Sequence, residues 1–244
     1  MQAGLEPRFV LWHLNDVSTQ ENKYRVSVDA GKNIMIYFIR HAESVSNAGG
    51  RTSDVVTIPL SEKGIGQAAD FAQHFKIKPD LVIMSPFIRT QQTAAPYLAK
   101  FPAVKTEIWN IQEFCCLDLD RCANTTPPER RELVVAYYEH EDPDYIDGRG
   151  AESFNQLLRR VDDMLAKLHL ISLEQNIVVF SHGLFMRAIQ FRMMKAPLSL
   201  KFFFNMESLP NLAVLQLDMA HNLLTRYNVD GFKTPEYVNC HREI

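Results

Sequence analysis

Residues 36–44 read IYFIRHAES, an apolar run that stops abruptly at a cation and an imidazole and continues with small and polar residues. Together with the preceding NIM, the apolar part is long and unbroken, which is typical of a β-strand buried on both faces. A buried strand that ends in Arg40 and His41 brings two polar groups to the edge of a core. We therefore expect this strand to open directly into a site that uses both side chains.

Two other apolar runs end in the same way. Residues 80–85 (DLVIMS) lead into SPFIRTQQTA, and residues 176–181 (NIVVFS) lead into SHGLFMRA. Each run passes from a buried strand to small or charged residues and then to a helical pattern. Ligands of open α/β sheets bind beyond the carboxyl ends of the parallel strands. We therefore expect the polar side chains beyond the three runs to gather at one edge of a sheet.

The pattern from residue 34 onward predicts the fold class. Ser61 is a suitable N-cap for a helix whose apolar residues recur at helical spacing up to Phe75. Strands and helices then alternate, which predicts an α/β fold, a three-layer αβα sandwich around a mostly parallel central sheet. Further helices are expected at 89–99, 128–140, 152–171 and 183–194, and strands at 103–109, 202–207, 211–218 and 223–228, the last two as a hairpin.

The chain divides into an extension and one catalytic domain. Residues 1–33 lack the regular strand–helix alternation of the rest of the chain, and their FVLWHL and YRVSV segments are compatible with a short β-hairpin. We expect residues 34–244 to form the catalytic domain. The first 16 residues lack the basic start and apolar core of a secretory signal, so we expect no such leader.

Composition and charge limit the function classes. The 244 residues carry a formal net charge of −3, which leaves no electrostatic footprint for nucleic acid or an anionic membrane. Any bound anion must therefore be held by a few local cations. No apolar stretch is long enough to cross a membrane. The four cysteines form neither a CxxC pair nor a zinc-site spacing, and reduced thiols in a cytoplasmic protein are expected.

Two guanidinium groups and two imidazoles are expected to converge: Arg40, Arg89, His41 and His182. With no metal-ligand spacing around them, they suit a phosphate, because a guanidinium offers a planar fork of donors to phosphate oxygens. An imidazole with an ordinary pKa of ~6.5 has a free ring nitrogen near neutral pH and can attack phosphorus. The second imidazole can hydrogen-bond the phosphoryl oxygens as charge redistributes. The leaving alkoxide still needs a proton from a nearby acid.

The segments RHAESVSN, SPFIRTQQTA and SHG resemble the signatures of the histidine phosphatase superfamily, which includes the phosphoglycerate mutases. PLSEKGIGQA, IQEF and GAES resemble further stretches of the same family. The resemblance covers about residues 34–217 in the right order, and the motifs are specific as a set, although SHG alone is not. One departure is Ala42, where many members have glycine.

The resemblance implies a role for each of seven residues and implies no metal or organic cofactor. It makes His41 the phosphorylated nucleophile, His182 the second catalytic histidine and Glu113 the general acid. Asp118 and Asp120 lie close behind Glu113 and are the alternatives for the acid. The phosphate-binding groups that it implies are Arg40, Asn47, Arg89 and the backbone around Gly183.

We therefore expect a phosphatase that hydrolyses a small phosphorylated metabolite, with inorganic phosphate as a second ligand. The alternatives are mutase-type phosphoryl transfer and a non-catalytic phospholigand-binding module. Residues 114–132 do not match the longer basic, proline-rich segment of the mutases, which favours the phosphatase. In this segment Arg121, Arg130 and Arg131 suit either the mouth of the pocket or a solvated helix face. No nucleic-acid or membrane partner is expected, and a homo-oligomer is compatible with the sequence.

Overall fold

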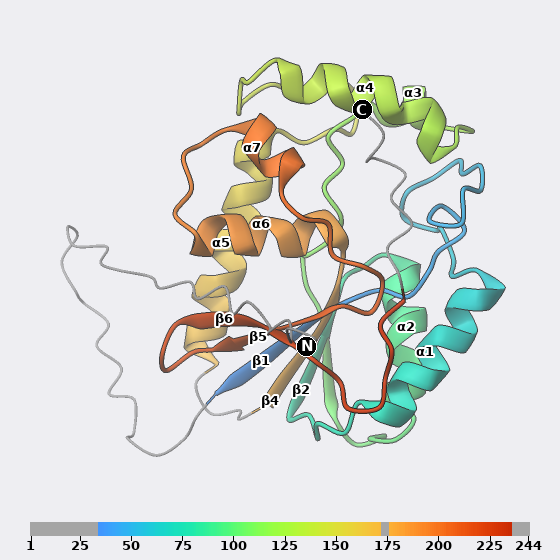
Figure 1. The fold of residues 1–244 in the computed structure, drawn as a ribbon, viewed down its shortest axis with the longest axis vertical. Coiled ribbons are helices and arrows are strands. Elements are labelled where there is room, and N and C mark those ends of the chain that lie inside the picture. Colours follow the sequence, from blue (N-terminus) through green and yellow to red (C-terminus); the bar gives the residue numbers. More distant parts are fainter. Residues whose placement is uncertain (1–33, 172–175, 236–244) are drawn as a thin grey trace, which may run out of the picture.

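The computed structural model describes residues 34–171 and 176–235 (Figure 1). The hairpin expected within residues 1–33 lies outside the described residues, as does Cys240. Within the described part, the three other cysteines, Cys115, Cys116 and Cys122, are free thiols. No helix described by the structure is long and apolar enough to span a bilayer.

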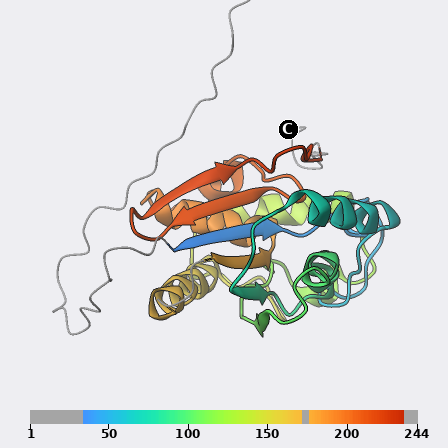
Figure 2. The same cartoon turned by 90° about the horizontal axis from the view of Figure 1, so that it is seen from below.

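The centre of the described fold is a six-stranded sheet with the order β3-β2-β4-β1-β5-β6. The first four strands in this order are parallel, whereas β5 pairs antiparallel with β1 and with β6. Figure 2 shows this order from the red antiparallel pair through the blue β1 to the green β2 and β3. The strands are β1 Met35–Arg40, β2 Leu81–Met84, β3 Lys105–Ile108, β4 Asn176–Ser181, β5 Val214–Asp218 and β6 Leu223–Tyr227.

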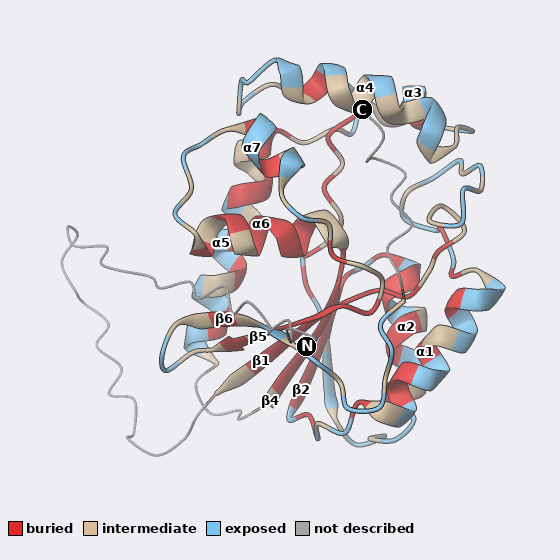
Figure 3. Ribbon diagram, in the orientation of Figure 1, coloured by how far each residue is buried: buried red, intermediate tan, exposed pale blue. Residues whose placement is uncertain are grey.

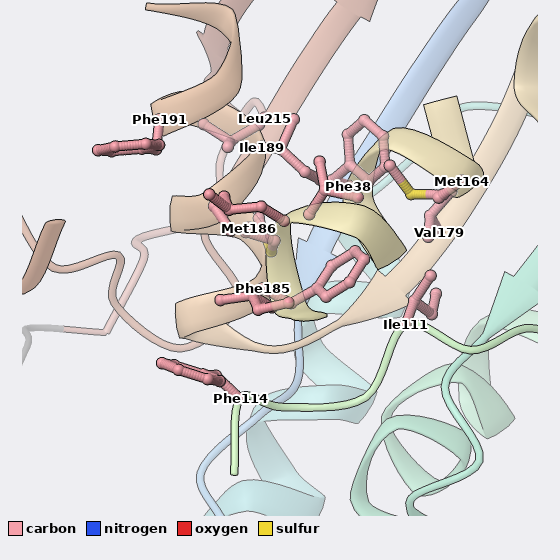
Figure 4. Close-up of a cluster of buried hydrophobic side chains, with 14 of the residues drawn as sticks. Phe38, Ile111, Phe114, Met164, Val179, Phe185, Met186, Ile189, Phe191 and Leu215 are labelled. Atoms are coloured by element: carbon pink, nitrogen blue, oxygen red, sulfur yellow. The ribbon is translucent and has the colours of Figure 1, made fainter. Parts of the chain in front are cut away.

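Helices cover both faces of the sheet, as the three-layer prediction requires (Figure 1). Along β1, Ile36 and Phe38 belong to the core under α5 and α6, while Tyr37 and Ile39 belong to the core under α1 and α2. Figure 4 shows the first cluster, and Figure 3 shows how completely the central strands are buried. The helices are α1 Glu62–His74, α2 Ile88–Leu98, α3 Leu119–Cys122, α4 Pro127–Glu139, α5 Phe154–Leu170, α6 Gly183–Met193 and α7 Leu200–Asn205.

The prediction of a strand at residues 202–207 is wrong, because most of this segment belongs to helix α7. Three consecutive phenylalanines have high β-propensity, and so short a run shows no period that separates strand from helix. In the structure, the side chain of Ser199 accepts a hydrogen bond from the Phe202 backbone N–H at 3.1 Å and caps the helix. Phe203 is then fully buried in the core beside α5 and α6. A cap and one buried ring therefore decide the local conformation.

Helix α1 is fixed against the segment that leaves β1. The predicted N-cap is confirmed, since the Ser61 hydroxyl accepts from Gly64 N–H at 2.9 Å. The Ser61 N–H in turn donates to the Glu43 carbonyl at 2.9 Å. A Cβ on Gly64 would lie 1.9 Å from that carbonyl oxygen. The glycine therefore allows the helix to pack directly against the backbone two residues beyond His41.

We expect Gly64→Ala to destabilise the protein by about 1–3 kcal/mol, because the backbone of Glu43 must shift. At about 2–4 °C per kcal/mol for a chain of this size, the melting temperature should fall measurably. Gly66→Ala is the matched control in the same helix: nothing lies within 4 Å of its Cβ position. Alanine should stabilise the helix there by about 0.8–1 kcal/mol. Equal melting temperatures for the two variants would contradict this packing.

Candidate active site

The side chains expected to meet at the sheet edge do meet. Six of the seven residues line one cavity of about 480 Å³, and these are Arg40, His41, Asn47, Arg89, Glu113 and Gly183. The seventh, His182, is fully buried beside it, with its ring centroid 5.2 Å from that of His41. The convergence comes from the sheet: His41 succeeds β1, His182 succeeds β4, and Arg89 lies at the start of α2 after β2.

The two ring nitrogens of His41 have different partners. Nδ1 lies 2.7 Å from the Ala42 carbonyl oxygen, which can only accept, so Nδ1 carries the proton. Nε2 therefore carries the lone pair, and Arg89 Nε donates to it at 3.2 Å. Burial, followed by the neighbouring charges of Arg89 and Arg40, lowers the pKa of His41 well below its usual range. The imidazole is therefore neutral at neutral pH, with Nε2 available as a nucleophile.

His182 is held in a definite tautomer by Ser85. The Ser85 hydroxyl oxygen accepts from the Phe87 N–H at 3.2 Å and lies 2.8 Å from His182 Nε2. Among the described residues, Nε2 is the one acceptor bonded to the Ser85 hydroxyl, so the hydroxyl donates to it and the His182 proton lies on Nδ1. That Nδ1 is buried and has no hydrogen-bond partner among the described residues. Burial, Arg89 and His41 lower the pKa of His182 well below its usual range, so the ring offers a neutral N–H donor.

The two arginines approach from different elements, Arg40 from the end of β1 and Arg89 from the start of α2. Arg89 is buried, and its Nη1 donates to the Val55 carbonyl at 2.7 Å. Burial lowers the pKa of Arg89 to about 10, which still leaves the group charged at neutral pH. Arg40 donates to the Leu209 carbonyl. A Cβ on Gly183 would lie 3.2 Å from Arg40 Nε, so the glycine of SHG allows the guanidinium to lie close to the start of α6.

The amide of Asn47 is oriented by its neighbours. Its Oδ1 accepts from the Ser44 backbone N–H at 3.2 Å and the Ser44 hydroxyl at 3.1 Å. Asn211 Nδ2 donates to the same oxygen at 3.1 Å and to the His41 carbonyl at 2.8 Å. With the oxygen occupied, the Asn47 NH₂ group is the end of the amide that remains for a ligand. Asn211 thus joins the strand exit that bears His41 to the amide of Asn47.

Glu113 is held by the start of α6. Its Oε1 accepts from the backbone N–H groups of Leu184 at 2.9 Å, Phe185 at 3.3 Å and Phe114 at 3.1 Å. A carboxylate at this position satisfies amides that have no partner within the helix. The other oxygen, Oε2, has no hydrogen bond to any described residue and is the one free to exchange protons.

The alternative acids are engaged elsewhere. Asp118 caps α3 and accepts from the Asp120 N–H at 2.9 Å, while Asp120 pairs with Arg149 at 3.0 Å. Neither carboxylate lines the cavity. Arg121 is paired with Asp147 and also lies off the cavity lining. Among these acids, Glu113 is therefore the one positioned to act on a group held between the arginines.

The segment that bears the acid is fixed from behind by the glutamate of GAES. Arg160 Nε donates to Glu152 Oε2 at 2.9 Å, and Arg160 Nη1 donates to the Gln112 carbonyl at 3.1 Å. Glu152 also accepts from the Cys115 N–H at 3.4 Å. These contacts hold the chain on both sides of Glu113. The GAES motif could be identified from the sequence, but only the fold shows that its glutamate, Glu152, pairs with Arg160.

The chain belongs to the histidine phosphatase superfamily (branch 1), whose family model matches residues 36–230. The family and fold expected from the motifs are thereby confirmed. The protein is a hydrolase of this superfamily, and its relatives support a phosphatase that acts on small phosphorylated metabolites.

Several phosphatases are similar to this chain over most of its length. Phosphoserine phosphatase 1 from Hydrogenobacter thermophilus is 26% identical over 214 residues, which cover 86% of this chain and 100% of that protein. Metal-independent phosphoserine phosphatase from Arabidopsis thaliana is 28% identical over 66% of this chain and 69% of its own length. Among solved structures, an alpha-ribazole phosphatase from Shigella flexneri superposes with a TM-score of 0.65 at 21% identity, covering 81% of this chain and 96% of that one. The structural likeness establishes the fold.

Three supporting residues were not found from the sequence. Ser85 opens the SPFIRTQQTA motif, so a signal for it was present. Thr93, whose Oγ1 accepts from the Ala42 N–H at 3.0 Å, lies in the same motif. Asn211 opens the strand expected at 211–218, but β5 begins only at Val214, so Asn211 lies in the preceding loop and only the fold brings it to His41. None of the described residues forms a group of three or more histidine, cysteine or acidic side chains able to hold a metal.

We expect Ser85→Ala to lower kcat by roughly 5- to 100-fold, because losing one buried hydrogen bond frees the tautomer of His182. Imidazole ¹⁵N shifts should report the wild-type Nδ1–H form and its loss in the variant. Ser153→Ala is the matched control: this buried serine caps α5 outside the site. It should lower stability without altering the His182 signals. A His182 tautomer unchanged by Ser85→Ala would contradict the assignment.

Proposed function

We propose that this protein hydrolyses a phosphomonoester through a phosphohistidine formed at Nε2 of His41. The observation that carries this proposal is the fixed tautomer of His41: the Ala42 carbonyl holds the proton on Nδ1 at 2.7 Å. The lone pair on Nε2 is then directed toward the flanking guanidinium of Arg89 at 3.2 Å. A neutral nucleophile beside two cations is the arrangement that a phosphoryl acceptor needs.

In the bound state, the phosphate would take its donors from four groups around the nucleophile. Arg40 and Arg89 supply charged donors, and Asn47 supplies its free NH₂ group. The backbone at Gly183 is the fourth group, whereas the next N–H, of Leu184, already donates to Glu113. When the phosphate takes the Arg89 Nε–H bond, it releases the lone pair of His41 Nε2. Substrate binding therefore activates the nucleophile.

The first transfer forms the Nε2–phosphorus bond as the bond from phosphorus to the ester oxygen breaks. Protonated Glu113 gives its proton from Oε2 to the leaving alkoxide. The Nδ1–H of His182 donates to a phosphoryl oxygen as negative charge redistributes. In the second step Glu113 takes a proton from water, the hydroxide oxygen bonds to phosphorus, and the Nε2–phosphorus bond breaks. Inorganic phosphate leaves, and His41 and Glu113 return to their starting states.

Two observations favour hydrolysis over mutase transfer. The Hydrogenobacter phosphatase relative is matched over its full length, whereas phosphoglycerate mutase 2 of Arabidopsis thaliana is matched over 38% of this chain and 32% of its own length. Residues 114–132 also lack the mutase pattern. A screen of phosphorylated metabolites that includes 3-phosphoglycerate, with both released phosphate and isomerised product measured, separates the two reactions. A non-catalytic module would yield neither product.

The proposed reaction uses groups of this chain and water, and it needs no metal or organic cofactor. The rest of the proposal comes from the sequence: a cytoplasmic enzyme with a small phosphorylated substrate and no nucleic-acid partner. The assignment of residues 34–244 as one catalytic domain, preceded by an extension, belongs to the same proposal.

We expect His41→Ala to abolish phosphate release from p-nitrophenyl phosphate, because no other described group takes its place. Wild-type enzyme quenched during turnover of a ³²P-labelled substrate should retain an acid-labile, alkali-stable label. His41→Ala should retain none. Appreciable turnover by the variant would exclude the covalent route.

We expect Glu113→Gln to slow turnover by about 10²- to 10⁴-fold, since the amide cannot donate a proton to the alkoxide. Competitive inhibition by inorganic phosphate should change little, because the phosphate-binding groups are retained. Asp120→Asn is the control: this carboxylate is exposed and paired with Arg149 away from the cavity. If the control loses activity and Glu113→Gln does not, the acid is misassigned.

A further inference from the structure

The loop at residues 209–213 holds Arg40 by both its backbone and its side chain. It leads into β5, which lies beside β1 in the sheet (Figure 2). The Leu212 N–H donates to the Arg40 carbonyl at 3.1 Å, and the Arg40 N–H donates to the Ala213 carbonyl at 3.1 Å. The Arg40 guanidinium in turn donates to the Leu209 carbonyl. The loop therefore encloses the exit of β1, where the groups that would bind phosphate begin.

The backbone of this loop is strained at Leu212. Its φ of 60° lies in the left-handed region, which a leucine rarely adopts. The side chain is nevertheless buried in the core under α1 and α2. Strained backbone persists where the surrounding structure fixes it, and such positions cluster at functional sites. The strained residue directly follows Asn211, whose side chain reaches the exit of β1.

The side-chain amide of Asn211 lines the cavity but has no donor left for a ligand. Its Nδ2 donates to the His41 carbonyl at 2.8 Å and to Asn47 Oδ1 at 3.1 Å. An amide nitrogen carries two hydrogens, so these two bonds use both of them. The amide oxygen of Asn211 can only accept and would repel a phosphate. Asn211 can therefore affect a bound phosphate only through the residues that it contacts.

The residue through which Asn211 can act is Asn47. Reversing the Asn47 amide would turn its NH₂ group toward the Asn211 donor and toward the N–H of Ser44, which donates to Oδ1 at 3.2 Å. Two donors facing each other cannot bond. Ser44 belongs to the same turn as Asn47 and moves with it. Asn211, which is distant in sequence, fixes the amide relative to the carbonyl of His41.

We propose that Asn211 is a positioning residue for phosphate binding. It keeps the Asn47 amide in the orientation that presents the NH₂ group to the phosphate, and it fixes that group against the backbone of His41. This inference rests on the proposed phosphatase function and adds to it a residue that does not itself touch the phosphate. The strained loop is the element that brings this residue to the sheet edge.

We expect Asn211→Ala and Asn211→Leu each to weaken the binding of inorganic phosphate by roughly 3- to 10-fold, the effect of one lost neutral hydrogen bond. Leucine has nearly the shape of asparagine but no hydrogen-bonding groups, so agreement between the variants assigns the loss to the hydrogen bonds rather than to empty space. Titration calorimetry gives the dissociation constant without turnover. With p-nitrophenyl phosphate, KM should rise more than kcat falls.

A double-mutant cycle separates positioning from a general structural effect. Asn47→Ala removes the donor itself, so Asn211→Ala should weaken phosphate binding little further in that background. Two independent losses would instead multiply. Asn155→Ala is the matched control: its amide donates to Asp144 at 2.8 Å away from the cavity, and the dissociation constant should stay at the wild-type value. Melting temperatures check that each variant is folded.

An unchanged dissociation constant in both folded Asn211 variants would overturn the proposal. So would losses that multiply in the double variant. A wild-type protein that binds phosphate but releases none from p-nitrophenyl phosphate would instead refute the phosphatase function, and the calorimetric cycle would still decide the role of Asn211.

Discussion

The register between β1, β4 and β2 is the constraint on which the site depends. Arg40 lies opposite Ser181, and Phe180 lies opposite Met84. The ladder runs one residue beyond the strands, since the His41 N–H donates to the Ser181 carbonyl at 3.0 Å and the Ser85 N–H donates to the Phe180 carbonyl at 3.1 Å. His41 and His182 thus succeed β1 and β4 at the same level, and Ser85 succeeds β2 one position earlier, level with Arg40 and Ser181. A slip of one residue would turn each side chain to the opposite face.

The same sheet edge explains the protonation states of the histidines. The strands beneath are buried on both faces, so the imidazoles are dehydrated and lie beside guanidiniums that do not lose their protons at neutral pH. Both effects disfavour the imidazolium form. His41 is therefore neutral because of its surroundings, and its tautomer is set by one carbonyl. The fold therefore sets the electrostatics of His41 by itself, before any ligand binds.

Features of the fold and of the candidate site could be predicted from the sequence where a short stretch of residues indicated them. The unbroken apolar runs gave the buried strands, and their exits gave Arg40, His41, Arg89 and His182, because parallel strands end at one edge. Glu113 was found by its motif, and only the fold showed that α6 amides hold one of its oxygens. Asn211 is separated from Asn47 by more than half the chain. No residue pattern near Asn211 indicates its hydrogen bond to Asn47. The strand predicted for the phenylalanines of α7 was wrong, because the Ser199 cap and the burial of Phe203 outweighed their β-propensity.

The two sides of the cavity, the sheet edge and the α3–α4 segment, are held by different kinds of contact. The reacting groups lie at the ends of strands whose positions are fixed by a shared hydrogen-bond ladder and by two buried cores. The α3–α4 segment is held instead by side-chain contacts and one bridge, such as the Arg51–Glu129 ion pair, the ring contact of Tyr137 with Phe204, and the bridge between Thr52 and Thr125. Substitutions on α4 can therefore alter the lining of the cavity without moving the ladder that holds the histidines.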